Sequence, residues 1–240
     1  MKSILVVGAG RFGIHLIRQL HKGGDEILAV DISEERLEHV LDYVTSSLIG
    51  DATDEDFVRS IGVSNFDVCI VAIGDNFQSS LETTSLLKEC GAKFVVARAS
   101  REVHEKFLLR NGADAVIFPE KQMAEWTAIR FSSTNILDYI EVPGEYSIFE
   151  IAVPKHWVGK SLLELKIRQN THLNVVAVRK TGGELNFDVD PETVFEEGSS
   201  LMILGRDKDI KKHVITYSGY ARFQCALLAP KAAAKLDVTP

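Results

Sequence analysis

The 240-residue sequence predicts an α/β protein, with a Rossmann-like, doubly wound sheet of six parallel strands followed by a small α+β module. Short apolar runs alternate with segments of helical periodicity from residue 3 to about residue 138. Most of these runs are β-branched and almost continuously apolar, as in parallel strands that helices cover on both faces. The first run leads into Gly8-Ala9-Gly10-Arg11-Phe12-Gly13, a pattern typical of the first strand–helix turn of such a sheet.

The first 138 residues divide into six strand–helix units. The strands are expected at residues 4–7, 27–31, 47–49, 68–72, 94–97 and 115–118. The helices are expected at residues 12–21, 34–44, 54–61, 77–90, 102–111 and 120–138. Ser33 is suited to cap the second helix, because its hydroxyl can accept a hydrogen bond from a first-turn N–H. Six units at this spacing favour one parallel sheet covered on both faces.

A second, smaller unit follows a break at Pro143 and Gly144. We therefore expect a nucleotide-binding domain at residues 1–138, a linker at 139–145 and a second domain at 146–215. Its strands are expected at residues 147–153, 175–180 and 200–204, and its short helices at 161–168 and 207–213. Residues 216–240 are rich in Ala and Lys and lack periodicity, so we expect a tail that is disordered or not native.

Composition and charge exclude several classes of protein. With 45% hydrophobic and 25% charged residues, the chain resembles ordinary globular proteins. The net charge of -7 argues against a general nucleic-acid surface. Cys69, Cys90 and Cys225 are odd in number and lack metal-ligand spacing, so we expect a disulfide-free cytoplasmic protein. No apolar run approaches the roughly 18 residues of a membrane span, and the strand at the N-terminus leaves no room for a signal peptide.

The glycine-rich segment predicts a nucleotide site, because each glycine has a physical role there. Gly8 permits a tight turn, Gly10 lets the backbone approach a phosphate, and Gly13 lets the helix pack closely on the strand. The helix that begins there directs free N–H groups and a positive dipole end at the anion. Asp31, at the end of the second strand, is placed to accept hydrogen bonds from ribose hydroxyls. A carboxylate there repels a 2′-phosphate and disfavours NADP against NAD, ATP or ADP.

The other strand ends supply the rest of the expected site, because the carboxyl ends of parallel strands meet at one edge of the sheet. Arg11 could reach a terminal phosphate, although an exposed first-turn arginine is the alternative. Asp51 suits the exocyclic amine of adenine, and Arg98 offers a second cation. At any one strand end, turn chemistry alone would explain these residues. The full set of expected nucleotide contacts is Gly8, Gly10, Arg11, Phe12, Gly13, Asp31, Ile32, Ser33, Arg36, Asp51, Ala52, Thr53, Ala72, Ile73, Gly74, Asp75, Asn76, Gln78, Arg98 and Glu120.

The sequence offers no catalytic set beside this site. No Ser-His-Asp, Cys-His or metal-ligand constellation is recognisable, and the second module is too small for a typical substrate domain. We therefore expect a non-enzyme that senses a nucleotide. Two alternatives stay open: an NAD(H)-dependent oxidoreductase, and a structural adaptor whose nucleotide stabilises a dimer.

These motifs together resemble the RCK family, the regulators of K⁺ conductance, and within it the cytosolic gating subunits of bacterial Ktr and Trk potassium uptake systems, the Ktr type above all. The matching segments are residues 8–13, 28–31, 70–74, 112–114, 119–121, 135–140, 145–148 and 204–210. The resemblance therefore extends in order from the N-terminus to about residue 214.

The resemblance implies two RCK domains and homodimers assembled into an octameric ring beneath a K⁺-translocating membrane subunit, on the inner face of the membrane. ATP and ADP would compete for the first domain, with ATP activating, and related domains bind NAD or NADH. Arg11 would reach the γ-phosphate, and Glu120 would face a neighbouring subunit's nucleotide with Mg²⁺ or another divalent cation between them. In relatives the second module can bind cyclic di-AMP, and the matching region holds Ile167, Arg168, Asn174 and Pro191.

Overall fold

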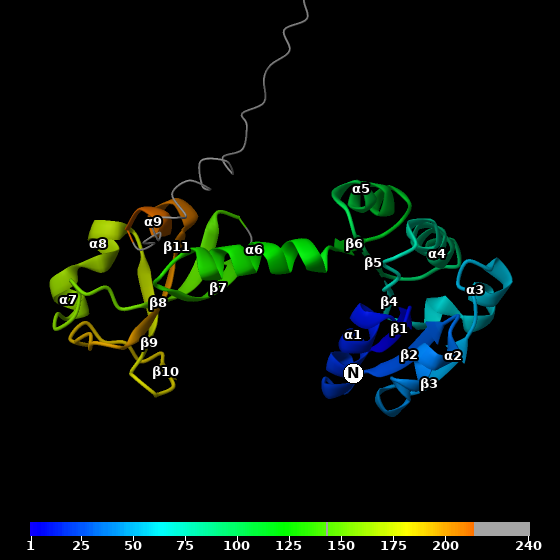
Figure 1. The fold of residues 1–240 in the computed structure, drawn as a ribbon, viewed down its shortest axis with the longest axis horizontal. Coiled ribbons are helices and arrows are strands. Elements are labelled where there is room, and N and C mark those ends of the chain that lie inside the picture. The colour runs from blue at the N-terminus through cyan, green and yellow to red at the C-terminus, as the bar shows by residue number, and fades with distance from the viewer. Residues whose placement is uncertain (143, 214–240) are drawn as a thin grey trace, which may run out of the picture. The chain divides into compact units, whose positions relative to one another are not determined.

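The computed structural model describes residues 1–142 and 144–213, whose helices and strands are drawn in Figure 1. The chain divides into two compact units, of which the first covers Met1–Gln122 and the second begins at Met123. Among the described residues, no helix is both long enough and apolar enough to cross a bilayer. The residues expected to form a tail, 216–240, lie outside the described residues.

The first unit contains the expected six-stranded parallel sheet, in the order β3-β2-β1-β4-β5-β6. Its strands are β1 (Ser3–Val7), β2 (Glu26–Asp31), β3 (Ser46–Ile49), β4 (Val68–Val71), β5 (Val95–Arg98) and β6 (Ala115–Ile117). Its helices are α1 (Arg11–Lys22), α2 (Glu34–Glu38), α3 (Glu55–Ile61), α4 (Phe77–Glu89) and α5 (Glu102–Arg110), with 3₁₀ turns at Leu41–Tyr43 and Val63–Asn65. The Rossmann-like fold class predicted from the sequence is confirmed.

Two hydrophobic cores lie on the two faces of this sheet, because successive side chains of a strand point to opposite faces. In β1, Ile4 and Val6 pack with residues of α1 and α2. Leu5 and Val7 pack with residues of α3, α4 and α5. Both faces of β1 are therefore buried, which explains why its sequence is continuously apolar.

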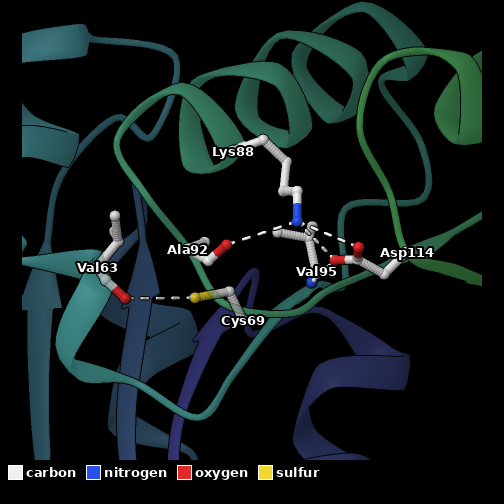
Figure 2. Close-up of polar contacts among 6 residues, drawn as sticks. All are labelled: Val63, Cys69, Lys88, Ala92, Val95 and Asp114. Atoms are coloured by element: carbon white, nitrogen blue, oxygen red, sulfur yellow. Dashed lines mark hydrogen bonds and ion pairs between the residues drawn. The ribbon is translucent and has the colours of Figure 1, made fainter.

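An ion pair connects α4 to the loop before β6, as Figure 2 shows. Lys88 Nζ lies 2.8 Å from Oδ2 of Asp114, and the same oxygen accepts the Val95 N–H at 2.7 Å. A side chain at Gly112 would collide with Lys88, and the φ of Gly112 is +104°. Cys69 lies nearby in β4, fully buried, and burial raises the pKa of its thiol to about 12. Cys69 is therefore a core residue with an unreactive thiol.

The second unit contains an antiparallel sheet in the order β10-β9-β11-β8-β7. Its strands are β7 (Ile136–Val142), β8 (Tyr146–Ala152), β9 (Asn174–Arg179), β10 (Leu185–Asn186) and β11 (Ser200–Arg206). Its helices include α7 (Leu162–Leu165), α8 (Ile167–Thr171) and α9 (Asp207–His213). Phe149, Ile151, Leu201 and Ile203 form its core with Phe195. One helix was expected at residues 161–168, but Lys166, with φ +45°, divides it into α7 and α8.

The segment between the two units differs from the sequence-based expectation. The helix predicted at 120–138 is α6 (Pro119–Ser132), and residues 136–142 form β7. Residues 139–142, expected to belong to a linker, therefore form part of the second sheet. Short polar side chains bind backbone groups where the helix ends: Ser132 Oγ donates to the Ile129 carbonyl at 3.4 Å, and the Asn135 N–H donates to Ser133 Oγ at 3.5 Å. Arg130 then donates to the Ile136 carbonyl at 2.6 Å, which fixes the turn into β7.

Candidate nucleotide-binding site

A cavity of about 490 Å³ lies at the carboxyl ends of β1 and β4. The order of the strands reverses here: β2 and β3 extend the sheet on one side of β1, and β4, β5 and β6 extend it on the other. Ligands of doubly wound proteins bind at this kind of position. The cavity is lined by Gly8, Gly10, Arg11, Ile32, Arg36, Asp51, Ala72, Ile73, Gly74, Asp75, Asn76, Ser79 and Arg98.

Two of the three glycines of the first turn, Gly8 and Gly13, have the conformational roles that the sequence predicts for them. Gly8 has a φ of +103°, and its N–H donates to the Val30 carbonyl at 2.7 Å. A Cβ at Gly13 would overlap the Gly8 carbonyl oxygen, so only glycine allows the helix to lie so close to the strand. A Cβ at Gly10 would meet no protein atom within 4 Å, and Gly10 lines the cavity. Gly10 therefore leaves open space at the cavity, and the approach of a phosphate to it remains a prediction.

Two helices of the first unit begin at the cavity. α1 begins after Gly10, which has no side chain to cap the first-turn N–H groups. α4 begins after Asn76, whose side chain accepts the Ser79 N–H. Neither helix has an acidic residue in its first turn, whereas α2 and α3 each have two. Uncapped N–H groups and the positive ends of two helix dipoles therefore favour an anion in the cavity.

Asp31 is buried, at 5% exposure, and holds the glycine-rich loop in place. Its Oδ2 accepts the Ala9 N–H at 2.7 Å, and its Oδ1 accepts the Ser33 N–H at 2.9 Å. Asp31 is not among the residues that line the cavity. Its contact with a ribose remains a prediction, and the structure adds the role of connecting β1 to the end of β2.

The side of the cavity near β2 and β3 suits a purine. Ile32 is 69% exposed and offers an apolar surface, and Arg36 lies 3.7 Å from the Asp31 carboxylate. Asp51 accepts hydrogen bonds from the backbone N–H and the hydroxyl of Thr53, at 2.9 Å and 2.7 Å. These hydrogen bonds lower the pKa of Asp51, so it is an oriented, ionised acceptor at neutral pH.

Arg98 lies at the opposite side, near the glycine-rich turn. Its guanidinium occupies the space that a side chain at Gly74 would fill, and it lies 5.5 Å from the centroid of the Phe12 ring. One of its terminal nitrogens donates to the carboxylate of Glu120, in the first turn of α6. Burial raises the pKa of Glu120, but its own backbone N–H, the Arg98 hydrogen bond and charge, and the Arg11 charge together bring the pKa below its usual value.

The structure gathers most of the expected nucleotide contacts and assigns others to supporting positions. Lining the cavity are Gly8, Gly10, Arg11, Ile32, Arg36, Asp51, Ala72, Ile73, Gly74, Asp75, Asn76 and Arg98. Outside the lining are Phe12, Gly13, Asp31, Ser33, Ala52, Thr53, Gln78 and Glu120, several of which hold lining residues in place. Ser79 lines the cavity and was not expected there; its place in the first turn of a helix that follows β4 is the signal that identifies it.

A second cavity, of about 630 Å³, lies in the second unit. Arg168 and Asn174 line it, together with basic residues that include Arg206 and Lys212. Ile167 is buried in the core instead, and the Pro191 carbonyl accepts the Leu163 N–H at 2.8 Å. Of the four positions expected near a second ligand, two therefore line a basic cavity.

Comparison with known proteins identifies the family. The TrkA-N domain model matches residues 4–119, and the TrkA-C domain model matches residues 146–213. The chain is 39% identical over 211 residues to the Ktr system potassium uptake protein A of Bacillus subtilis (strain 168), which covers 88% of this chain and 95% of that protein. The chain belongs to the Ktr potassium uptake protein family. It is also 36% identical, with the same coverage, to protein C of the Ktr system in that organism.

Solved structures agree with the Ktr family fold. The GsuK RCK domain is 22% identical over 88% of this chain, with a TM-score of 0.63. A GsuK channel bound to NAD is 21% identical over 87% of this chain, with a TM-score of 0.61. This chain spans 46% and 38% of those two longer chains. The fold therefore resembles that of RCK domains, as the sequence motifs indicate.

Proposed function

We propose that this protein is a regulatory subunit that senses adenine nucleotides and controls potassium movement through a membrane subunit. The observation that carries the proposal is the cavity at the carboxyl ends of β1 and β4. It combines two helix N-termini with Arg11, Arg36 and Arg98. Such an arrangement suits a ligand with two or more phosphates.

The ionisable residues of the cavity favour sensing over catalysis. Among the described residues, those lining it include arginines and two aspartates but no His, Lys, Cys or Tyr. Arginine stays protonated at physiological pH, and the lowered pKa of Asp51 makes it both a poor proton donor and a weak proton acceptor. A hydride-transferring enzyme needs a proton donor or acceptor next to its substrate. The cavity therefore supports binding of a nucleotide without turnover.

Discrimination between ATP and ADP would depend on the terminal phosphate. Arg11 is exposed on the first turn of α1 at the cavity. We infer that Arg11 contacts the γ-phosphate, because its cationic side chain stands at the phosphate-facing turn. A ligand shifts a conformational equilibrium only by its difference in affinity for the two states. We infer that ATP and ADP favour two conformations of the assembled protein, and that ATP favours the activating one.

A divalent cation fits this site only if phosphate oxygens of the nucleotide supply some of the atoms that coordinate the cation. Among the described residues, no three His, Cys, Asp or Glu side chains come together as a metal site. Mg²⁺ is commonly held by one or two carboxylates together with phosphate oxygens. Glu120 is 56% exposed at its side chain and could contribute one carboxylate. The cation would reduce repulsion between Glu120 and a triphosphate.

The partners follow from the family. Relatives 39% and 36% identical are named potassium uptake proteins of the Ktr system. We infer a K⁺-translocating Ktr or Trk membrane subunit as the partner, and a cytoplasmic position at the inner face of the membrane. Homodimers assembled into an octameric ring would transmit the difference between ATP and ADP to that subunit. The basic cavity of the second unit, with Arg168 and Asn174, supports cyclic di-AMP as a second ligand.

The decisive experiment is titration of the purified protein with ATP, ADP and NADH under identical conditions, followed by mass measurement with each ligand. We expect micromolar or tighter binding of ATP and ADP and a change in assembly or shape between them. NADH is the control ligand, since a structurally similar GsuK channel was solved with NAD bound. A clear preference for NADH with turnover of a carbonyl substrate would establish the oxidoreductase. Binding without any change in assembly would establish the structural adaptor.

A further inference from the structure

We propose that Glu120 competes with the phosphates of the nucleotide for Arg98, so that binding of the ligand releases the first turn of α6. This inference rests on the proposed function. It assigns Glu120 a role within its own subunit that acts against binding in the absence of a divalent cation.

Arg98 cannot easily leave the cavity. Its side chain is 14% exposed, and its guanidinium fills the space beside Gly74 and lies next to the Phe12 ring. Its Nε is buried without a hydrogen-bond partner among the described residues. A partly buried guanidinium needs an anion close by, because an uncompensated charge in that position is costly. Whichever anion is present at the cavity must therefore meet Arg98 where it lies.

Glu120 is the more exposed member of the pair. Its side chain is 56% exposed, four times the exposed fraction of Arg98, and it lies in the first turn of a helix. Water can solvate its carboxylate, and the positive end of the α6 dipole stabilises it without Arg98. Leaving Arg98 therefore costs Glu120 little free energy, provided that another anion takes its place on Arg98.

A phosphate at the cavity would displace Glu120 from Arg98, because it makes stronger interactions there than a single carboxylate does. Phosphate oxygens accept two parallel hydrogen bonds from a guanidinium, and the two helix N-termini hold the rest of the anion. Glu120, left close to a polyphosphate, would be repelled by it. By linkage, an interaction that holds Glu120 on Arg98 must weaken phosphate binding by the same factor.

The test uses Glu120→Gln in the full-length protein, with EDTA present to remove divalent cations. Calorimetry measures the dissociation constants of ADP, ATP and adenosine. We expect ADP and ATP to bind E120Q about 2- to 5-fold more tightly than wild type, the range of an exposed ion pair. Adenosine has no phosphate, so its affinity should not change. The matched control is Glu102→Gln, which removes a carboxylate paired 3.0 Å from Lys121 in the same unit.

Unchanged or weaker binding of ADP and ATP by E120Q would overturn the proposal. If Glu120 competes with the phosphates for Arg98, removing its charge must strengthen nucleotide binding. Equal tightening by E102Q would overturn it too, by showing a general charge effect. If wild-type protein binds none of the three nucleotides ATP, ADP and NADH, the proposed function fails as well, which distinguishes the two failures.

Hydrogen exchange supplies a second readout that does not depend on affinity. The Gln122 N–H donates to the Phe118 carbonyl at 3.0 Å, in the turn that Glu120 belongs to. ADP without divalent cation should accelerate exchange in a peptide covering residues 119–124 of wild type. E120Q should show the faster exchange with and without ADP. Slower exchange in wild type on ADP addition would contradict release of the turn.

Discussion

The buried carboxylate of Asp31 accepts the backbone N–H of Ala9 at 2.7 Å, and thereby connects the end of β2 to the glycine-rich turn after β1. The position of the phosphate-facing loop therefore depends on a residue from the neighbouring strand. This relationship leads to the first prediction.

Asp31→Ala should destabilise the protein and weaken nucleotide binding. The substitution leaves the buried Ala9 N–H without an acceptor, at a cost of about 1–3 kcal/mol. Urea unfolding measures the stability change, and calorimetry with ADP measures binding. Asp25→Ala is the control, because Asp25 accepts the Lys2 N–H at 2.9 Å in an exposed position. Equal effects of the two substitutions would contradict the special role of Asp31.

Arg11→Ala should reduce the preference for ATP over ADP. A charge-assisted contact to the γ-phosphate contributes about 1.5–3 kcal/mol, which corresponds to roughly 10- to 150-fold in the ATP dissociation constant. ADP should bind within about 2-fold of wild type, a change of roughly 0.4 kcal/mol. Lys22→Ala, in the last turn of the same helix, controls for lost charge. Equal losses for ATP and ADP would show that Arg11 contacts an inner phosphate.

Gly13→Ala and Gly10→Ala should separate folding from binding. The new Cβ at position 13 overlaps the Gly8 carbonyl, so we expect destabilisation of about 1–3 kcal/mol or more. The new Cβ at position 10 meets no protein atom, and Gly10 has a φ of -73° that alanine adopts without strain. G10A should keep the melting temperature of wild type while binding ADP at least about 10-fold more weakly. Thermal unfolding and calorimetry on both variants provide the comparison.

The Lys88–Asp114 pair in Figure 2 should make stability depend on acid pH. Hydrogen bonds from Lys88 and from the Val95 N–H hold the pKa of Asp114 below its usual range. Between the pKa of Asp114 in the folded protein and its higher pKa in the unfolded chain, the unfolded chain binds more protons. The stability of the fold therefore rises with pH over that interval. The contribution of Asp114 to stability is complete above its pKa in the unfolded chain. It is lost as the pH falls through its pKa in the folded protein.

Asp114→Asn should therefore cost about 1 kcal/mol at pH 7. The difference from wild type should shrink as the pH falls below about 4. Urea unfolding of both proteins at pH 3 to 7 measures this difference in the free energy of unfolding. A difference that stays constant over this range would show that the charge of Asp114 does not contribute. Asp25→Asn serves again as an exposed control.

Local patterns predicted the first unit well. β1 and β4 are continuously apolar and bounded by turn residues, and the spacing of the glycines specifies the turn between β1 and α1. These signals depend on neighbouring residues in the chain, so they are visible without a structure. The same reasoning predicted one helix at 120–138, because Ile136 and Leu137 fit the helical spacing that begins at Met123. Pairing of β7 with β8 decides that Ile136 begins a strand, and pairing is a long-range interaction.

The sequence by itself determined the fold class, the nucleotide-binding edge of the first sheet and the residues that carry the phosphate-facing turn. It did so because steric limits on glycine and the burial of both faces of a parallel sheet act over short stretches of chain. Only the tertiary structure decided that Asp31 is buried against Ala9, that Ser79 reaches the cavity and that Arg98 pairs with Glu120. These contacts join different strands and helices, so which hydrogen-bond acceptor meets which donor depends on how those elements pack together.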